Sequence, residues 1–433
     1  MIKSILAGVL LAAIPLLHAA QADWPEFRGP TGDGQVAAPG AGKPVGLPLT
    51  WSETNNVRWK TEIPHRGWST PVAMGNQIWL TTATLGGNDF FAVCVDAATG
   101  KIVFNEKVFH CDQPEPLGNA VNCYASPSPV IEAGRVYVHF GSYGTACLDT
   151  SNAKVVWQRT DLQCRHFRGP GSSIVAFRDL LILTMDGIDL QYMVALDKKT
   201  GKTVWKTDRS AQWHDLDADG KPRGDGDYRK AYSTPLVANC GGMYQMFCPA
   251  AKAMYSYDPL TGKELWKVHD NCFSAAARPV YANGLAFMLT GLMEAELVAV
   301  RVDGQGDVTG SHVAWRCSQG AGRTPSPIIV DDLLYMPNDD GKVTCLETAT
   351  GKQVWQDRIG GSYCASPIHA DGRIYFCSTQ GKSTVLKAGR TFDVLATNVL
   401  AAGCMASPAV VDKALILRTK THLYRIEDAG AAR

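Results

Sequence analysis

Short runs of β-favouring residues, separated by polar turns, recur along the whole chain. In one unit the apolar run MVALD leads into DKKTGKTVWK, which places a polar turn before an alternating strand at residues 197–206. Gly201 can take the left-handed backbone conformation that closes a short hairpin, and the Asp197 carboxylate can bond the turn amides. Alternation with a period of two predicts a β-hairpin here rather than a helix.

Close copies of this hairpin start at Asp96, Asp258 and Glu347. Each hairpin is preceded by two further β-rich runs around a turn of Gly, Asp or Asn, as in STPVAMGNQIWLT from Ser69, so that one unit contains four antiparallel strands. The units share a reference position, which is proline in seven of eight copies: Pro71, Pro129, Ser173, Pro235, Pro279, Pro327, Pro367 and Pro408. Four-stranded units at this spacing are typical of the blades of a β-propeller.

Both ends of the repeat are incomplete. The last unit lacks a fourth strand, and the strand at residues 55–63 lacks three strands before it. Trp59 stands twelve residues before the first reference proline, as Trp315 and Trp355 stand before Pro327 and Pro367. We therefore predict an all-β fold at residues 55–428, an eight-bladed propeller of four-stranded antiparallel blades whose ring is closed by the N-terminal strand.

The segments outside the propeller predict export. Residues 1–22 combine Lys3, an apolar stretch too short to span a membrane and a small-residue cleavage pattern, which together indicate a signal peptide. We expect a periplasmic or extracellular protein, with a wrapping segment at residues 23–54 and a C-terminal tail at residues 429–433. No later apolar run is long enough for a transmembrane helix.

The net charge bears on the expected partners, and the cysteine positions bear on the expected disulfides. The formal net charge is +1 and no basic stretch is present, so a nucleic-acid partner is not expected; we expect a monomer. The thirteen cysteines stand mostly at small, apolar positions of the repeat, which predicts buried free thiols. Cys111 and Cys123, on either side of the loop DQPEPLGNAVN, are the best candidates for a disulfide.

The strongest local motif is the acidic stretch DLDADGKPRGDGD. Its calcium-loop pattern places carboxylates at alternating positions, followed by a residue that can offer a backbone carbonyl: Asp215, Asp217, Asp219 and Lys221. The bidentate acid of such loops is missing, because Gly226 stands at its position, and Asp225 or Asp227 would have to substitute. The stretch predicts either a calcium site that orders the loop or a solvated acidic turn.

The D-x-x-T-G-K-x-x-W units resemble the tryptophan-docking repeats of the pyrroloquinoline-quinone (PQQ) propellers, and WPEFRGPTGDG at residues 24–34 looks like the start of secreted members of that group. The resemblance implies the propeller fold. It leaves activity open, because the superfamily contains quinoprotein alcohol dehydrogenases and also the non-enzymatic propeller subunit of the outer-membrane β-barrel assembly machine. The adjacent Cys-Cys pair of those dehydrogenases has no match here, nor do their calcium ligands or catalytic Asp, so PQQ is not expected.

The function expected from these features is that of an exported, non-catalytic scaffold that binds a protein or an anionic ligand. The alternatives are a PQQ-dependent oxidoreductase and a carbohydrate- or polymer-binding protein. Two insertions, at residues 109–125 and 210–231, should emerge on one face, where propeller loops commonly form a recognition surface.

The binding residues are predicted from the inner strands. The residue before the reference position carries a small hydroxyl in seven copies and is Arg278 in the eighth. We expect Arg278 at the mouth of the channel, in a cationic and aromatic funnel for a carboxylate, an acidic glycan or an acidic peptide, formed with Arg168, Arg323, Trp68, Tyr124 and Tyr232. The alternative is that Arg278 bonds channel carbonyls and fills space at the axis.

Overall fold

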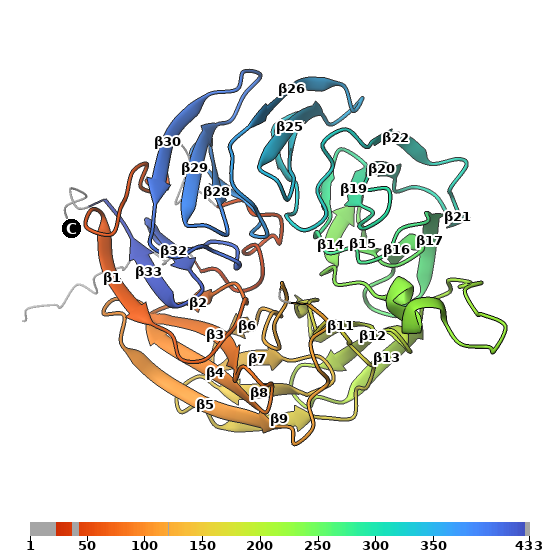
Figure 1. Cartoon of the computed structure of the whole chain (residues 1–433), viewed down its shortest axis with the longest axis horizontal. Coiled ribbons are helices and arrows are strands. Elements are labelled where there is room, and N and C mark those ends of the chain that lie inside the picture. Colours follow the sequence, from red (N-terminus) through yellow and green to blue (C-terminus); the bar gives the residue numbers. More distant parts are fainter. Residues whose placement is uncertain (1–22, 37–42, 120, 429–433) are drawn as a thin grey trace, which may run out of the picture.

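The computed structural model describes residues 23–36, 43–119 and 121–428, so the predicted signal peptide and C-terminal tail lie outside the described part. The described chain forms eight antiparallel sheets arranged as a ring (Figure 1). The prediction of an eight-bladed propeller is confirmed. No helix of the described residues is long and apolar enough to cross a membrane.

Each blade has four strands in order from the central channel to the rim. Blades 1 to 4 contain β2 (Val72–Met74), β3 (Gln77–Ala83), β4 (Asp89–Asp96) and β5 (Ile102–His110); β6 (Val130–Glu132), β7 (Arg135–His139), β8 (Thr145–Asp149) and β9 (Val155–Arg159); β10 (Val175–Phe177), β11 (Leu180–Asp186), β12 (Gln191–Asp197) and β13 (Thr203–Asp208); and β14 (Leu236–Cys240), β15 (Met243–Pro249), β16 (Ala253–Tyr257) and β17 (Glu264–His269). Blades 5 to 8 contain β18 (Val280–Ala282), β19 (Leu285–Leu289), β20 (Leu297–Arg301) and β22 (Val313–Cys317); β23 (Ile328–Val330), β24 (Leu333–Pro337), β25 (Lys342–Glu347) and β26 (Gln353–Arg358); β27 (Ile368–Ala370), β28 (Arg373–Cys377), β29 (Lys382–Lys387) and β30 (Val394–Val399); and β31 (Ala409–Val411), β32 (Ala414–Arg418), β33 (His422–Ile426) and β1 (Val57–Glu62).

Blade 8 joins the two ends of the propeller. Strand β1 pairs antiparallel with β33, with Val57 opposite Ile426 and Thr61 opposite Leu423. The predicted closure by the N-terminal strand is therefore confirmed. Blade 4 carries one additional strand, β21 (Gly306–Asp307), which pairs parallel with the outer strand β17.

The outer-strand tryptophans connect each blade to the next. The indole N–H donates to a carbonyl in the following outer hairpin in five blades: Trp59 to Ala97, Trp157 to Lys198, Trp205 to Pro259, Trp315 to Thr348 and Trp355 to Gly389. The glycine of the T-G-K turn lies directly under the ring, and a Cβ at Gly201 would be 2.6 Å from Trp157. The motif thus recurs because each turn must both reverse the chain and leave room for the indole of the preceding blade.

The hydroxyl position of the inner strands forms a ring of side-chain hydrogen bonds. Each backbone N–H donates to the hydroxyl of the next blade in six described cases: Thr70 to Ser128, Ser128 to Ser173, Ser173 to Thr234, Arg278 to Ser326, Ser326 to Ser366 and Ser366 to Ser407. Ser173, rather than Ser172, therefore holds the hydroxyl position of blade 3. The predicted register there was wrong by one residue, because this copy has Ile174 where the others have proline.

The segment at residues 23–36 closes one end of the channel. Trp24 pairs with Ala73 of blade 1, Ile131 of blade 2 donates its N–H to the carbonyl of Pro25, and Val36 donates to His369 of blade 7. Residues 43–54 then pack against blades 7 and 8; the Trp51 amide, for example, donates to the Asn398 side chain at 2.8 Å. The N-terminal segment therefore crosses and covers this end of the channel.

Candidate binding pocket

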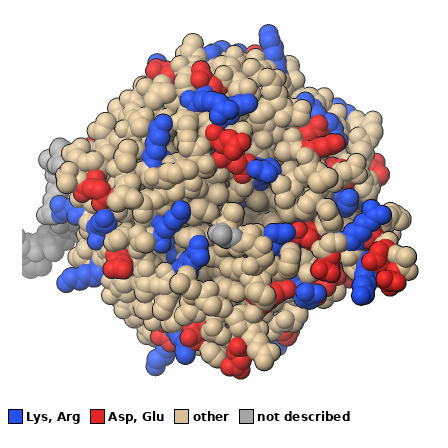
Figure 2. Space-filling view, in the orientation of Figure 1, with Lys and Arg blue, Asp and Glu red and all other residues tan. Residues whose placement is uncertain are grey.

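The open end of the channel is a pocket of about 940 Å³. Its walls come from the loops that precede the inner strands and from the turns between the second and third strands of the blades, and Phe27 of the N-terminal segment contributes to its lining from within the channel. Val121 of one insertion and Asp227 of the other both line it, so the two insertions emerge on one face, as expected. Figure 2 views this face, with basic and acidic side chains around its centre.

Four of the six predicted ligand-binding residues line the pocket: Trp68, Arg168, Tyr232 and Arg323. The Arg168 guanidinium makes a bidentate pair with Asp227, with Nε–Oδ1 and Nη2–Oδ2 distances of 2.9 and 2.7 Å. Asp227 therefore neutralises one of the predicted cations. The Arg323 Nε lies 3.5 Å from the Asp339 carboxylate, which also accepts a hydrogen bond from the Arg323 amide.

Arg278 lies away from the predicted funnel, and this part of the prediction needs correction. Its guanidinium is 2 % exposed, pairs with the Glu26 carboxylate at 2.9 Å and donates to the carbonyls of Phe27 and Pro235. The N-terminal segment supplies these acceptors inside the channel. Burial raises the pKa of Glu26 although the arginine opposes that shift.

Tyr124 is also absent from the pocket lining. It is buried, its hydroxyl donates to the Glu115 carbonyl at 2.8 Å, and its ring contacts those of Phe90 and Tyr143. The ring thus anchors the insertion at residues 109–125 to blade 1 and blade 2, because an aromatic side chain gains more from packing than from exposure.

Sequence reasoning missed two cations of the pocket, Arg66 and Lys420. Arg66 stands in the same kind of loop as the predicted residues, two positions before Trp68, and could have been found there. Lys420 lies in the turn between β32 and β33, a class of turn that the prediction did not consider. The aromatic Phe273 was missed as well, although it too precedes an inner strand.

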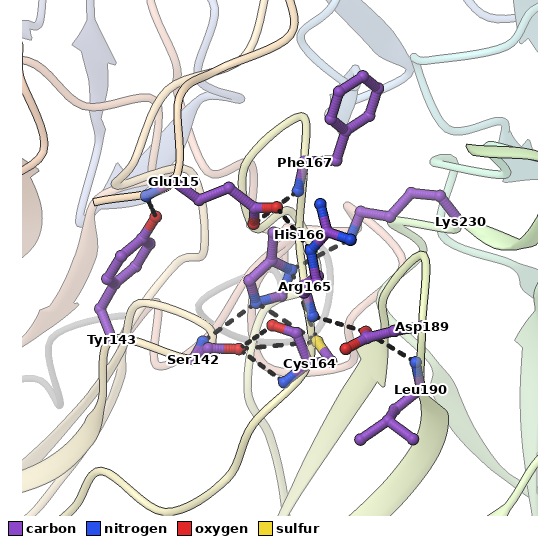
Figure 3. Close-up of polar contacts among 10 residues, drawn as sticks. All are labelled: Glu115, Ser142, Tyr143, Cys164, Arg165, His166, Phe167, Asp189, Leu190 and Lys230. Atoms are coloured by element: carbon purple, nitrogen blue, oxygen red, sulfur yellow. Dashed lines mark hydrogen bonds and ion pairs between the residues drawn. The ribbon is translucent and has the colours of Figure 1, made fainter. Parts of the chain in front are cut away.

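A buried polar network holds both insertions next to the pocket (Figure 3). Glu115 of one insertion accepts a hydrogen bond from the Phe167 amide at 2.8 Å, and Lys230 of the other lies 3.1 Å from His166 Nδ1. The Ser142 amide donates to His166 Nε2 at 3.0 Å. The network thereby fixes the loop that presents Arg168.

Two basic groups face each other in this network. His166 Nε2 accepts from the Ser142 amide, and His166 Nδ1 lies toward Lys230 Nζ. Burial, the largest cause in each case, lowers the pKa of both His166 and Lys230. Lys230 donates in turn to the Asp186 carbonyl at 2.9 Å.

The acidic stretch does not gather its carboxylates at one point. Asp215 pairs with Arg229, Asp227 pairs with Arg168, and Asp217 accepts from the amides of Asp219 and Lys221. Within the described ranges, no group of three acidic, His or Cys side chains could hold a metal ion. Calcium binding by Asp215, Asp217, Asp219, Lys221 and Asp227 therefore stays a prediction, and it would require these pairs to rearrange.

The candidate disulfide is absent. All thirteen cysteines are free, and the Cys123 thiol lies 3.3 Å from the Ser126 hydroxyl. Cys123 is buried beside the pocket wall, whereas Cys111 is half-buried at the end of β5. The expectation of mostly buried free thiols agrees with this arrangement.

These features define a class, that of eight-bladed propellers with one closed channel end and a loop-lined pocket at the other. The chain belongs to the PQQ_2 family, whose model is described as outer membrane protein assembly factor BamB and matches residues 49–223 and 191–431. A search of curated proteins found no match.

Several solved structures are similar in fold. Quinohemoprotein alcohol dehydrogenase from Comamonas testosteroni superposes with a TM-score of 0.67 at 13 % identity, over 95 % of this chain and 81 % of that one. BamB from Moraxella catarrhalis has a TM-score of 0.58 at 11 % identity, over 87 % of this chain and 98 % of that one. The computationally designed Ika8 protein has a TM-score of 0.57 at 10 % identity, over 88 % and 100 %. The fold is therefore shared by an enzyme, an assembly factor and a designed protein, and does not decide between catalysis and binding.

Proposed function

We propose that the protein is an exported, non-catalytic scaffold that binds a polypeptide partner on the face that carries the pocket. One observation supports this proposal above the others. The large apolar side chains that are most exposed among the described residues, Leu85 at 75 % and Met293 at 72 %, both stand in turns of this face. Four more belong to the same face: Val121, Leu190, Leu216 and Tyr228.

Exposed apolar groups on the face that carries the pocket favour a protein partner. Apolar groups that cluster on a soluble surface commonly mark interaction sites, and loops on a rigid scaffold are where recognition is usually located. Tyr228 also contacts Phe273 with a ring-centroid distance of 4.8 Å, and Phe273 lines the pocket. The apolar surface therefore continues from the insertion into the pocket.

Export is part of the same proposal. It is supported by the signal-peptide pattern at residues 1–22 and by the family description, which names an outer membrane assembly factor. We propose a periplasmic or extracellular location on these grounds.

A selection experiment tests the binding proposal. The purified protein is used to select binders from a library of random peptides, and binding is then compared with the Leu85→Lys/Met293→Lys variant. The matched control is Met243→Lys/Leu260→Lys, which places the same charges on exposed apolar positions of the opposite face. We expect the first pair to abolish binding and the control to preserve it. The proposal would be contradicted if no peptide binders were recovered. It would also be contradicted if the peptides bound the Leu85→Lys/Met293→Lys variant as well as the wild-type protein.

The second candidate function is PQQ-dependent oxidation, which is favoured by the likeness to an alcohol dehydrogenase and by the axial pocket. The chemistry of the pocket fits it poorly. Calcium, which the resemblance implies beside the quinone, prefers several carboxylate and carbonyl oxygens, whereas Asp227 and Asp339 each face an arginine.

A further inference from the structure

One wall of the pocket carries cations without acidic partners. Arg66 and Lys420 line the pocket at the junction of blades 8 and 1, and neither forms an ion pair with any described carboxylate. The Arg66 guanidinium instead lies 4.9 Å from the centre of the Trp68 ring. The other two pocket arginines, Arg168 and Arg323, already face acids. The free positive charge of the pocket is therefore confined to this wall.

A third cation, Arg418, supports the same wall from behind. Its guanidinium is 3 % exposed and donates to the carbonyls of Ser69 and Thr81 and to the Ser69 hydroxyl, with no described carboxylate in reach. A Cβ at Gly67 would clash with it, so the loop that carries Arg66 and Trp68 rests directly on this charge. Burial lowers the pKa of Arg418 to about 10, which leaves it charged at neutral pH.

A buried cation without a counter-ion is costly, and a bound anion would offset that cost. We propose that Arg66, Lys420 and Trp68, backed by Arg418, form a subsite for a single carboxylate of a polypeptide partner, contributed by an Asp or Glu side chain. This inference rests on the proposed function and names the chemistry that its partner presents. Trp68 offers an apolar ring beside the carboxylate, and its indole N–H is already bonded to the Val121 carbonyl at 3.1 Å.

The rest of the pocket favours one carboxylate over a polyanion. Asp227, Asp339 and Asp340 line the other walls, and the formal net charge of the chain is +1. A sulfated glycan would bring several negative charges close to these acids, whereas one carboxylate can meet the Arg66 wall alone. Charge complementarity on this wall also fixes how a bound peptide segment would be oriented.

The test uses propionate, a monocarboxylate that reproduces the end of a Glu side chain, with isothermal titration calorimetry and the melting temperature as readouts. Wild-type protein is compared with Arg66→Met/Lys420→Met. The control is Arg178→Met/Lys263→Met, which removes the same charge from exposed positions that do not line the pocket. Arg418 is left unchanged because it is buried. We expect saturable binding that weakens as salt is raised, and at least a tenfold loss of affinity in the first variant alone.

Two results would overturn the inference. One is the absence of saturable propionate binding by the wild-type protein, and the other is equal binding by the wild-type protein and the Arg66→Met/Lys420→Met variant. Dextran sulfate is tested separately: binding of this polymer without propionate binding would replace the carboxylate subsite by a sulfated-glycan site. The peptide selection described above remains an independent measurement. Propionate binding without peptide binders would contradict the scaffold proposal and leave the anion subsite in place.

Discussion

The Trp59 indole lies against Gly100 of blade 1, where a Cβ would be 2.6 Å from the ring, and it donates to the Ala97 carbonyl at 2.9 Å. This contact fastens blade 8 to blade 1 at the point where the ring closes. Gly100 has φ +75°, a conformation that is strained for other residues.

We expect Gly100→Ala to destabilise the fold by about 2–4 kcal/mol, because a left-handed backbone penalty and an overpacking penalty add. The matched control is Gly134→Ala, at φ +78° with nothing within 4 Å of the added Cβ, which should cost about 1–2 kcal/mol. Urea unfolding of the two variants measures the difference. Equal losses would mean that the indole contact contributes nothing.

Much of this architecture could be predicted, because a repeated unit leaves a periodic signal. The blade number follows from the eight reference positions, and the closing strand follows from the spacing of Trp59. The position of the Arg278 side chain could not be predicted. Its partners Glu26 and Phe27 belong to the N-terminal segment, which is not part of the repeat and is distant in sequence. Tyr124 was misplaced for a related reason: a loop aromatic gives no sign of whether it packs inward or faces a ligand.

The pair of Arg278 and Glu26 should be structurally important. Arg278→Met is expected to cost about 3–5 kcal/mol, since it leaves the buried Glu26 carboxylate and the Phe27 carbonyl without their donor. Arg323→Met, at a half-exposed pocket arginine, should change stability by less than about 1 kcal/mol. Thermal melting compares the two variants. A melting temperature of Arg278→Met that equals that of the wild-type protein would contradict a role for this pair in closing the channel.

Acid should destabilise the protein through buried histidines. Burial lowers the pKa of His139 to about 3 and that of His166 well below its usual range. Between these values and the ordinary histidine pKa of about 6.5, the unfolded chain binds more protons than the folded chain, so stability falls as pH falls below about 6.5. Each histidine contributes a loss of about 1.4 kcal/mol per pH unit in that window.

The histidine prediction is checked by urea unfolding from pH 7 downward. His139→Gln keeps a polar group near the Thr145 hydroxyl, which lies 2.8 Å from His139 Nδ1, and should flatten the decline. His269→Gln, at an exposed site, is the control. A slope that is unchanged in His139→Gln would rule out a contribution from this residue.

PQQ-dependent turnover is expected to be absent. With PQQ and calcium added, the protein should not reduce an electron-acceptor dye at the expense of alcohols or sugars, since Asp227 and Asp339 are held by Arg168 and Arg323. A quinohemoprotein alcohol dehydrogenase serves as the positive control. Turnover that a chelator abolishes would establish the oxidoreductase alternative instead.

Thiol labelling provides a fold-wide check. Cys111, Cys240, Cys317 and Cys364 are half-buried, and the other nine cysteines are buried. A maleimide should therefore label some or all of these four in the native protein, and all thirteen after unfolding in denaturant. Mass spectrometry identifies the labelled sites. Early labelling of Cys147 or Cys345, which lie inside blades, would contradict the packing described above.

The pairing of β1 with β33 also has a kinetic consequence. Val57 and Ile426 are 369 residues apart in sequence (426 − 57), and contacts of such separation form slowly because a long loop must close first. During synthesis, blades 1 to 7 can assemble in order as they emerge, each on its predecessor. Blade 8 must wait for almost the whole chain. Until β33 is made, β1 keeps an unpaired strand edge that can associate with the wrong partner. The strand that is made first is thus among the last to find its partner.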